Sequence, residues 1–170
     1  MENHQEKLKD LLICELKDIY SAEEQIVKGL PDAIAAADCD ELKKALEQNL
    51  AETKNQVKRL NKVFNMLNIP AESETCEAMQ GLTKEVKESL GKLEKGPLRD
   101  AALISKLQRI EHYEMAVYGT LRTFAKELGL SEIKDILQES LDEEGAADKA
   151  LTKIAEGGLF KTGINRLANK

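Results

Sequence analysis

The residues of this sequence that could do chemistry are glutamates that stand where helical spacing predicts buried leucines. Three segments carry apolar residues at every third or fourth position, and glutamate interrupts each of these apolar seams near its middle. The interrupting residues are Glu23, then Glu111 and Glu114, and then Glu144. Glu52 lies on a less regular seam, and we expect it to face the core as well. Carboxylates gathered inside a helical core would be hard oxygen ligands for metal ions.

The same residues lie at matching heights. In an antiparallel helical hairpin, residues that are equidistant from the turn lie side by side. The equidistant pairs are Glu23 with Glu52 about residues 37–38, and Glu114 with Glu144 and Glu111 with Asp148 about Gly129. Helical periodicity alone does not require this coincidence. The sequence therefore predicts an acidic cluster at mid-height, with metal ligands Glu23, Glu52, Glu111, Glu114, Glu144 and Asp148.

Such a cluster requires neutralisation. Burial of one unpaired carboxylate costs on the order of several kcal/mol, and crowding adds mutual repulsion. The seams hold no Lys or Arg at these heights, and protonation would require large pKa shifts. Two metal ions would neutralise the group, with iron as the first candidate and manganese as the second. The alternative is that some of these glutamates bend towards solvent or bond to neighbouring polar groups.

Three further side chains lie close to this predicted site. Tyr118 follows Glu114 by one turn, so its hydroxyl either bonds to a ligand carboxylate or is satisfied elsewhere in the core. His112 lies about 100° around the helix from Glu111, which favours a surface or packing role over metal ligation. Gln56 shares the line of Glu52 and is expected to be a hydrogen-bond donor to a ligand or a weak oxygen ligand.

The elements that must position these residues are long helices. Apolar periodicity, prolines and glycines predict helices over about 5–32 or slightly beyond, 40–67, 75–90, 100–128 and 131–155. Short turns pair the first with the second and the last two with each other. The 68–99 connection carries its own short helix and can cross the bundle, as in ferritin-like folds. We therefore expect an all-α, ferritin-like antiparallel four-helix bundle over residues 1–156, followed by a basic tail over 157–170 that is frayed or docked.

Composition excludes several classes of protein. A net charge of −6 argues against the nucleic-acid backbone as the main partner. No apolar run reaches membrane-spanning length, and the N-terminal residues have no apolar signal core. The three cysteines, Cys14, Cys39 and Cys76, lack the spacing of a disulfide framework or a zinc site. These features favour a cytoplasmic protein with reduced thiols.

Four segments of the sequence resemble the YciF/YciE-type family of bacterial, stress-associated, ferritin-like proteins. They are residues 16–23 (LKDIYSAE), 52–60 (ETKNQVKRL), 110–121 (IEHYEMAVYGTL) and 141–144 (LDEE), and the resemblance extends over about residues 8–155. It implies a four-helix bundle with an additional helix, a homodimer, and a dinuclear metal centre of the rubrerythrin kind. By this resemblance Glu23, Glu52 and Glu144 stand where three of the bundle helices supply ligands, and Glu111 and Glu114 match a Glu-x-x-Glu pair.

The sequence departs from the usual di-iron pattern in one respect. Such bundles carry Glu-x-x-His twice, whereas Asn55 and Ala147 stand three residues after Glu52 and Glu144. Gln56 and Asp148, four residues on, share the same faces. The expected site is therefore rich in oxygen ligands.

Two functions follow from these expectations. The first is a di-metal oxidoreductase or iron-handling protein acting on peroxide, oxygen or ferrous iron, with no catalytic residue assigned. The second is a metal-free structural or partner-binding helical dimer.

Overall fold

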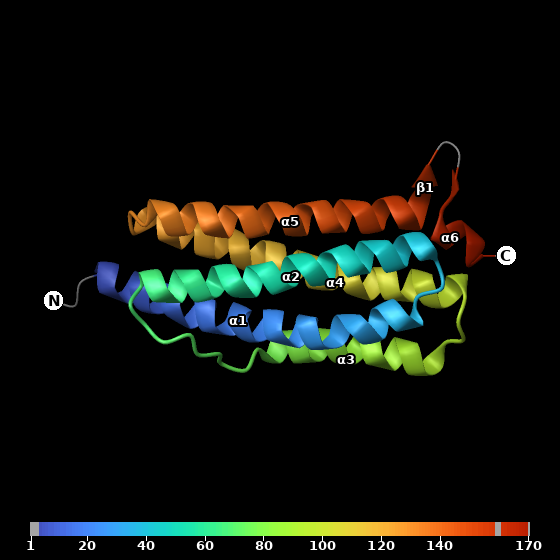
Figure 1. Cartoon of the computed structure of the whole chain (residues 1–170), viewed down its shortest axis with the longest axis horizontal. Coiled ribbons are helices and arrows are strands. Elements are labelled where there is room, and N and C mark those ends of the chain that lie inside the picture. Colours follow the sequence, from blue (N-terminus) through green and yellow to red (C-terminus); the bar gives the residue numbers. More distant parts are fainter. Residues whose placement is uncertain (1–3, 159–160, 170) are drawn as a thin grey trace.

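The chain forms long helices that run along a common direction (Figure 1). A computed structural model describes residues 4–158 and 161–169. The long helices are α1 (His4–Ala36), α2 (Asp40–Met66), α3 (Glu77–Lys92), α4 (Pro97–Glu127) and α5 (Ser131–Glu156). None of the described helices is both long and apolar enough to span a bilayer.

Four of these helices make the bundle. α1 and α2 form one antiparallel hairpin, and α4 and α5 form the other. The hairpins pack together through contacts of α2 with α5 and of α1 with α4, while α3 lies outside against α1 and α4. The predicted all-α bundle of two hairpins joined by a helical crossover is confirmed.

The buried face of helix α2 is shifted slightly from the one expected, although Leu46, Leu60 and Phe64 are buried as predicted. Apolar periodicity alone would place Leu50 and Val57 on the buried line of α2, but both are half-buried. Asn49 and Gln56 are buried in their place, at 7% and 1% exposed. Glu52 lies beside this buried line and is half-buried, less than the core-facing position expected of it. The physical reason is that both amides bond to buried carboxylates, which a leucine could not do.

The turn between α1 and α2 is held by the first turn of α4. Asp100 is buried and accepts hydrogen bonds from the backbone N–H groups of Asp38, at 2.9 Å, and Cys39, at 2.7 Å. Arg99 donates from Nη2 to the backbone oxygen of Ala36 at 2.6 Å. α4 begins at Pro97, earlier than the expected start near residue 100, since a proline is well suited to the first helical position.

The crossover is tied to α1 before α3 begins. Backbone N–H of Cys76 donates to Ser21 Oγ at 3.1 Å, and Gln25 Nε2 donates to the Cys76 backbone oxygen at 3.2 Å. Cys76 then caps α3, because its sulfur accepts from the N–H of Met79. α3 therefore starts at Glu77 and not near residue 75.

The chain after α5 packs back on the bundle. Strands β1 (Gly157–Gly158) and β2 (Lys161–Thr162) pair antiparallel, and the short helix α6 (Ile164–Leu167) contacts α4 and α5. Gly157 has φ +79°, and a Cβ there would lie 2.3 Å from the backbone nitrogen of Gly163. Ile164 is buried, so this part of the predicted tail is docked.

Replacement of Asp100 by alanine is expected to destabilise the protein by about 2 to 4 kcal/mol, because two backbone N–H groups lose their acceptor. Urea unfolding measures this change. The matched control is Asp10→Ala at an exposed position of α1, which should change the free energy of unfolding by less than about 0.5 kcal/mol. Equal stability of the two variants would contradict the role given to Asp100.

Candidate metal centre

Four glutamates from three helices meet inside the bundle, and we call them the glutamate cluster. Glu23 comes from α1, Glu111 and Glu114 from α4, and Glu144 from α5. Their exposures are 0%, 2%, 1% and 1%, so all four belong to the core. Carboxylate oxygens of Glu111, Glu114 and Glu144 all lie within 4.8 Å of one another. That spacing lets one ion contact all three carboxylates.

The helices place these residues by their spacing. Glu111, Glu114 and Tyr118 stand three and four residues apart, so they share one face of α4. Leu107 precedes them on this face and Leu121 follows, and both are buried. The apolar seam therefore continues above and below the acidic residues and fixes the face that α4 presents.

Neutral donors contact three of the four carboxylates. Tyr118 Oη donates to Glu23 Oε1, and Gln56 Nε2 donates to Glu144 Oε1. Asn49 Nδ2 donates to Glu111 Oε1 at 3.4 Å, a long hydrogen bond. Of the alternatives open for Tyr118 and Gln56, the structure shows a hydrogen bond from each to a glutamate of the cluster. Four buried oxygens of the cluster still receive no hydrogen bond from another kind of side chain among the described residues: Glu23 Oε2, Glu111 Oε2, Glu114 Oε1 and Glu144 Oε2.

The described part of the chain gives the cluster no cationic partner. Within residues 4–158 and 161–169, no lysine, arginine or histidine forms an ion pair with any of the four carboxylates. Arg59 of α2 instead pairs with Glu143, the neighbour of Glu144, and donates from Nη1 at 2.6 Å and from Nη2 at 2.7 Å. Glu143 thus takes the cation, while its neighbour Glu144 faces the core.

Burial dominates the electrostatics of the cluster. It raises the pKa of Glu23, Glu111 and Glu114 well above the usual value for glutamate and raises the pKa of Glu144 in the same direction. The negative charge of Glu144 adds to the effect of burial on Glu23 and Glu114. Burial beside Glu23 also raises the pKa of Tyr118, so its hydroxyl stays protonated and donates.

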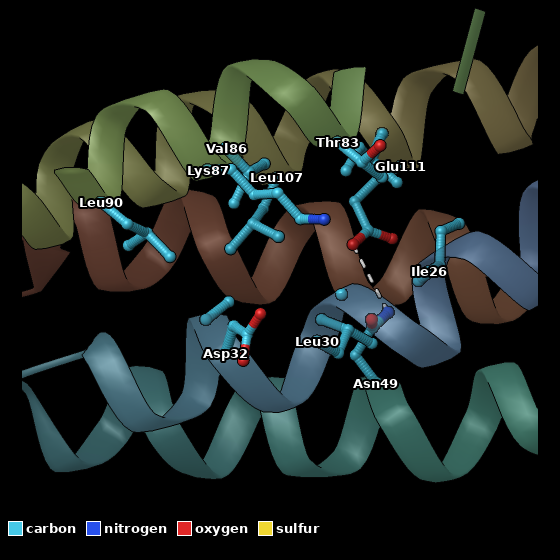
Figure 2. Close-up of a pocket in the computed structure, with 13 residues that line it drawn as sticks. Ile26, Leu30, Asp32, Asn49, Thr83, Val86, Lys87, Leu90, Leu107 and Glu111 are labelled. Carbon is cyan, nitrogen blue, oxygen red and sulfur yellow. Dashed lines mark hydrogen bonds between the residues drawn. The ribbon is translucent and has the colours of Figure 1, made fainter. Parts of the chain in front are cut away.

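Glu111 also reaches a pocket at the edge of the cluster. Figure 2 shows its carboxylate at one end of a pocket between α1, α3 and α4, with the bond from Asn49 drawn as a dashed line. The side walls are apolar and include Leu30, Val86 and Leu107. Glu111 is therefore the member of the cluster that an incoming molecule can approach from this side.

Two predicted ligands, Glu52 and Asp148, are not part of the group that Glu111, Glu114 and Glu144 form. Glu52 is half-buried, and its Oε1 accepts from Gln48 Nε2 at 2.9 Å. Asp148 is 20% exposed, accepts from Gln108 Nε2 at 2.9 Å and lies 3.3 Å from His112 Nε2. His112 is 65% exposed, as expected for a residue off the core face. Metal ligation by Glu52 and Asp148 stays a prediction.

Asn49 also contacts the cluster, and the sequence pattern did not predict this contact. It is polar, buried and bonded to Glu111. Its signal in the sequence is its spacing from Gln56, because residues seven apart share one face of a helix. Two amides on one face, opposite predicted buried carboxylates, would have placed both residues in the core.

Comparison with known proteins identifies the chain. A family model described as a domain of unknown function, DUF892, matches residues 7–163. Protein YciF of Escherichia coli (strain K12) is 38% identical over 160 residues, which covers 94% of this chain and 96% of the relative. The chain belongs to the YciF-type family. The resemblance found in the four sequence segments is confirmed.

Two solved structures show the fold of the YciF-type family. The crystal structure of the E. coli stress protein YciF matches with a TM-score of 0.83 at 38% identity, covering 90% of this chain and 94% of that one. YcfI from Rhodopseudomonas palustris matches with a TM-score of 0.85 at 41% identity, covering 87% of this chain and 94% of that one. The ferritin-like helical bundle is therefore shared along nearly the whole length.

The metal-free protein is expected to lose stability as pH rises. Because burial raises the pKa of Glu114 in the folded state, the folded chain binds more protons than the unfolded chain above pH 4.5. The free energy of unfolding should then fall by about 1.4 kcal/mol per pH unit for each such group, until pH passes the raised pKa. Urea unfolding with a chelator, from about pH 5 to about pH 8, measures this slope.

The variant Glu114→Gln removes one titrating group without changing the shape of the side chain. Its slope should be shallower and its stability at about pH 8 higher than in the unaltered chain. Glu47→Gln, at an exposed position of α2, is the matched control and should keep the original slope. A Glu114→Gln slope equal to that of the control would show that Glu114 stays ionised in the folded protein.

Proposed function

We propose that the glutamate cluster holds a pair of metal ions, with iron as the first candidate and manganese as the second. The observation that carries this proposal is the set of four buried carboxylate oxygens without a hydrogen-bond partner, one on each glutamate. A buried polar atom without a partner costs about 1–3 kcal/mol, so four together favour a ligand that all of them share. Four ionised carboxylates carry the charge that two divalent cations would balance.

Different residues of the chain would bind the ions and orient the ligands at such a centre. Glu111, Glu114 and Glu144 would hold one ion between their carboxylates, and Glu23 would extend the donor set to the second. Tyr118 would keep Glu23 in place, and Gln56 would orient Glu144. Leucines above and below would exclude water. Bound iron or manganese would supply redox chemistry towards peroxide, oxygen or ferrous iron.

The name of the E. coli relative, a stress protein, supports a place for this chemistry in a stress response. Oxidants and free ferrous iron are the stresses that a carboxylate-bound metal pair would meet directly. We therefore propose this protein as a di-metal carboxylate protein of the stress response.

A metal-free scaffold is the second candidate, and one observation favours it. Tyr118, Gln56 and Asn49 each donate to one carboxylate, so the cluster is partly satisfied without any ion. Protonation of the remaining oxygens would complete that arrangement, at the raised pKa values that burial produces. The two candidates differ in whether the purified chain carries metal.

The metal pair predicts about two ions per chain in protein purified without added metal, measured by elemental analysis. Glu144→Ala and Glu23→Ala should each lower the metal content, since each removes a ligand. In the unaltered chain, an ion at about 100 times its Kd should stabilise the fold by about 2.7 kcal/mol.

The matched control is Glu139→Ala on the outer side of α5, where the side chain pairs with Arg59. It should keep the full metal content. Unchanged metal in both cluster variants would rule out this site. Protein that holds no metal natively, and gains no stability from added iron or manganese, would favour the scaffold.

The homodimer that the resemblance implies stays a prediction. Light scattering tests it, since a dimer would have twice the chain mass of 18.9 kDa. A monomer, or an assembly of many chains, would contradict it.

A further inference from the structure

A second pocket leads to Glu111 from the opposite side of the cluster. It lies between α2 and α5 and has a cavity volume of about 90 Å³. Its polar lining consists of Gln48, Asn49, Glu52 and Glu111. The pocket thus joins the half-buried carboxylate of Glu52 to a member of the glutamate cluster.

Small residues on α5 keep this pocket open. Ala146, Ala147 and Ala150 line it where α5 faces α2. The buried Leu151 also lines the pocket, whereas Ala146 and Ala150 are exposed and Ala147 is half-buried. The alanines therefore leave the outer part of the pocket open to solvent, while Glu111 lies at its buried end.

Oxygen ligands are arranged in order of burial along the pocket. Glu52 is half-buried, Asn49 is 7% exposed and Glu111 is 2% exposed. Glu52 and Asn49 stand three residues apart on α2, and Asn49 bonds to Glu111. Glu111 Oε2, at the inner end, has no hydrogen-bond partner. A cation that enters here meets a carboxylate, then an amide oxygen, and then the cluster.

Charge distinguishes this pocket from the one in Figure 2. The pocket between α1, α3 and α4 has apolar walls, and Asp32 and Lys87 contribute opposite charges. In the pocket between α2 and α5, the charged lining residues are Glu52 and Glu111 alone. A cleft lined by one sign of charge raises the local concentration of counter-ions and their rate of entry.

We propose that the pocket between α2 and α5 is the route by which divalent cations reach the cluster, and that Glu52 captures them at its mouth. This inference rests on the proposed metal centre. It gives Glu52 a role outside the centre: it binds ions in transit, where the sequence pattern had predicted a permanent ligand. A residue that acts on a route changes the rate of loading and leaves the number of ions bound at equilibrium unchanged.

Stopped-flow mixing of the metal-free full chain with Mn²⁺ or Co²⁺ tests the role of Glu52. Glu52→Gln should slow association about tenfold while the chain still binds the same number of ions. Glu47→Gln, which removes the same charge from an exposed position of α2 outside the pocket, should slow it less than about twofold.

A second variant tests the route itself. Ala147→Leu fills the pocket and should also slow association about tenfold, without loss of bound ions. Ala78→Leu, at an exposed position of α3, is the matched control and should load at the original rate.

Three results would overturn the inference. Loss of a bound ion in Glu52→Gln would make Glu52 a ligand of the centre. Equal association rates for Glu52→Gln and Glu47→Gln would remove its role in capture. An unchanged rate in Ala147→Leu would place the route elsewhere. Failure of the unaltered chain to bind any ion is a different outcome, because it would reject the metal centre itself.

Discussion

The repulsion between carboxylates that are shielded from water is the constraint on which the rest of this structure depends. The four side chains of the glutamate cluster are each at most 2% exposed, and burial raises the pKa of every one. Such a group is stable only with protons, hydrogen-bond donors or cations among its oxygens. The protein supplies neutral donors from α2 and α4 and directs Arg59 to an outer glutamate. The described residues therefore stabilise the cluster with neutral donors and leave it without a cation of the chain's own.

This constraint also sets the orientation of α2. Hydrophobicity alone predicts that Leu50 and Val57 are buried, whereas the structure buries Asn49 and Gln56. The exchange costs some apolar burial, and it provides amide donors to Glu111 and Glu144. A helix in contact with buried charge is thus rotated by its polar residues as much as by its leucines.

The sequence could predict the fold and most of the cluster because both follow from periodicity. Glu23, Glu111, Glu114 and Glu144 interrupt clean apolar seams, and proline and glycine mark the helix ends. Glu52 and Asp148 were harder, because distance from a turn gives the height of a residue and says nothing of its direction around the helix axis. The direction in which a side chain points depends on how its helix packs against helices that are far apart in the sequence. Asp148, for example, accepts a hydrogen bond from Gln108 of α4, a contact that spacing along α5 does not predict.

The contact between Asp100 and the first turn has a consequence for how the chain folds. The amides of Asp38 and Cys39 find their acceptor 62 and 61 residues later, on a helix of the other hairpin. An isolated N-terminal hairpin would leave these groups to water and its turn loosely defined. Closure of the first hairpin therefore becomes complete when α4 docks, which couples the two halves into one cooperative unit.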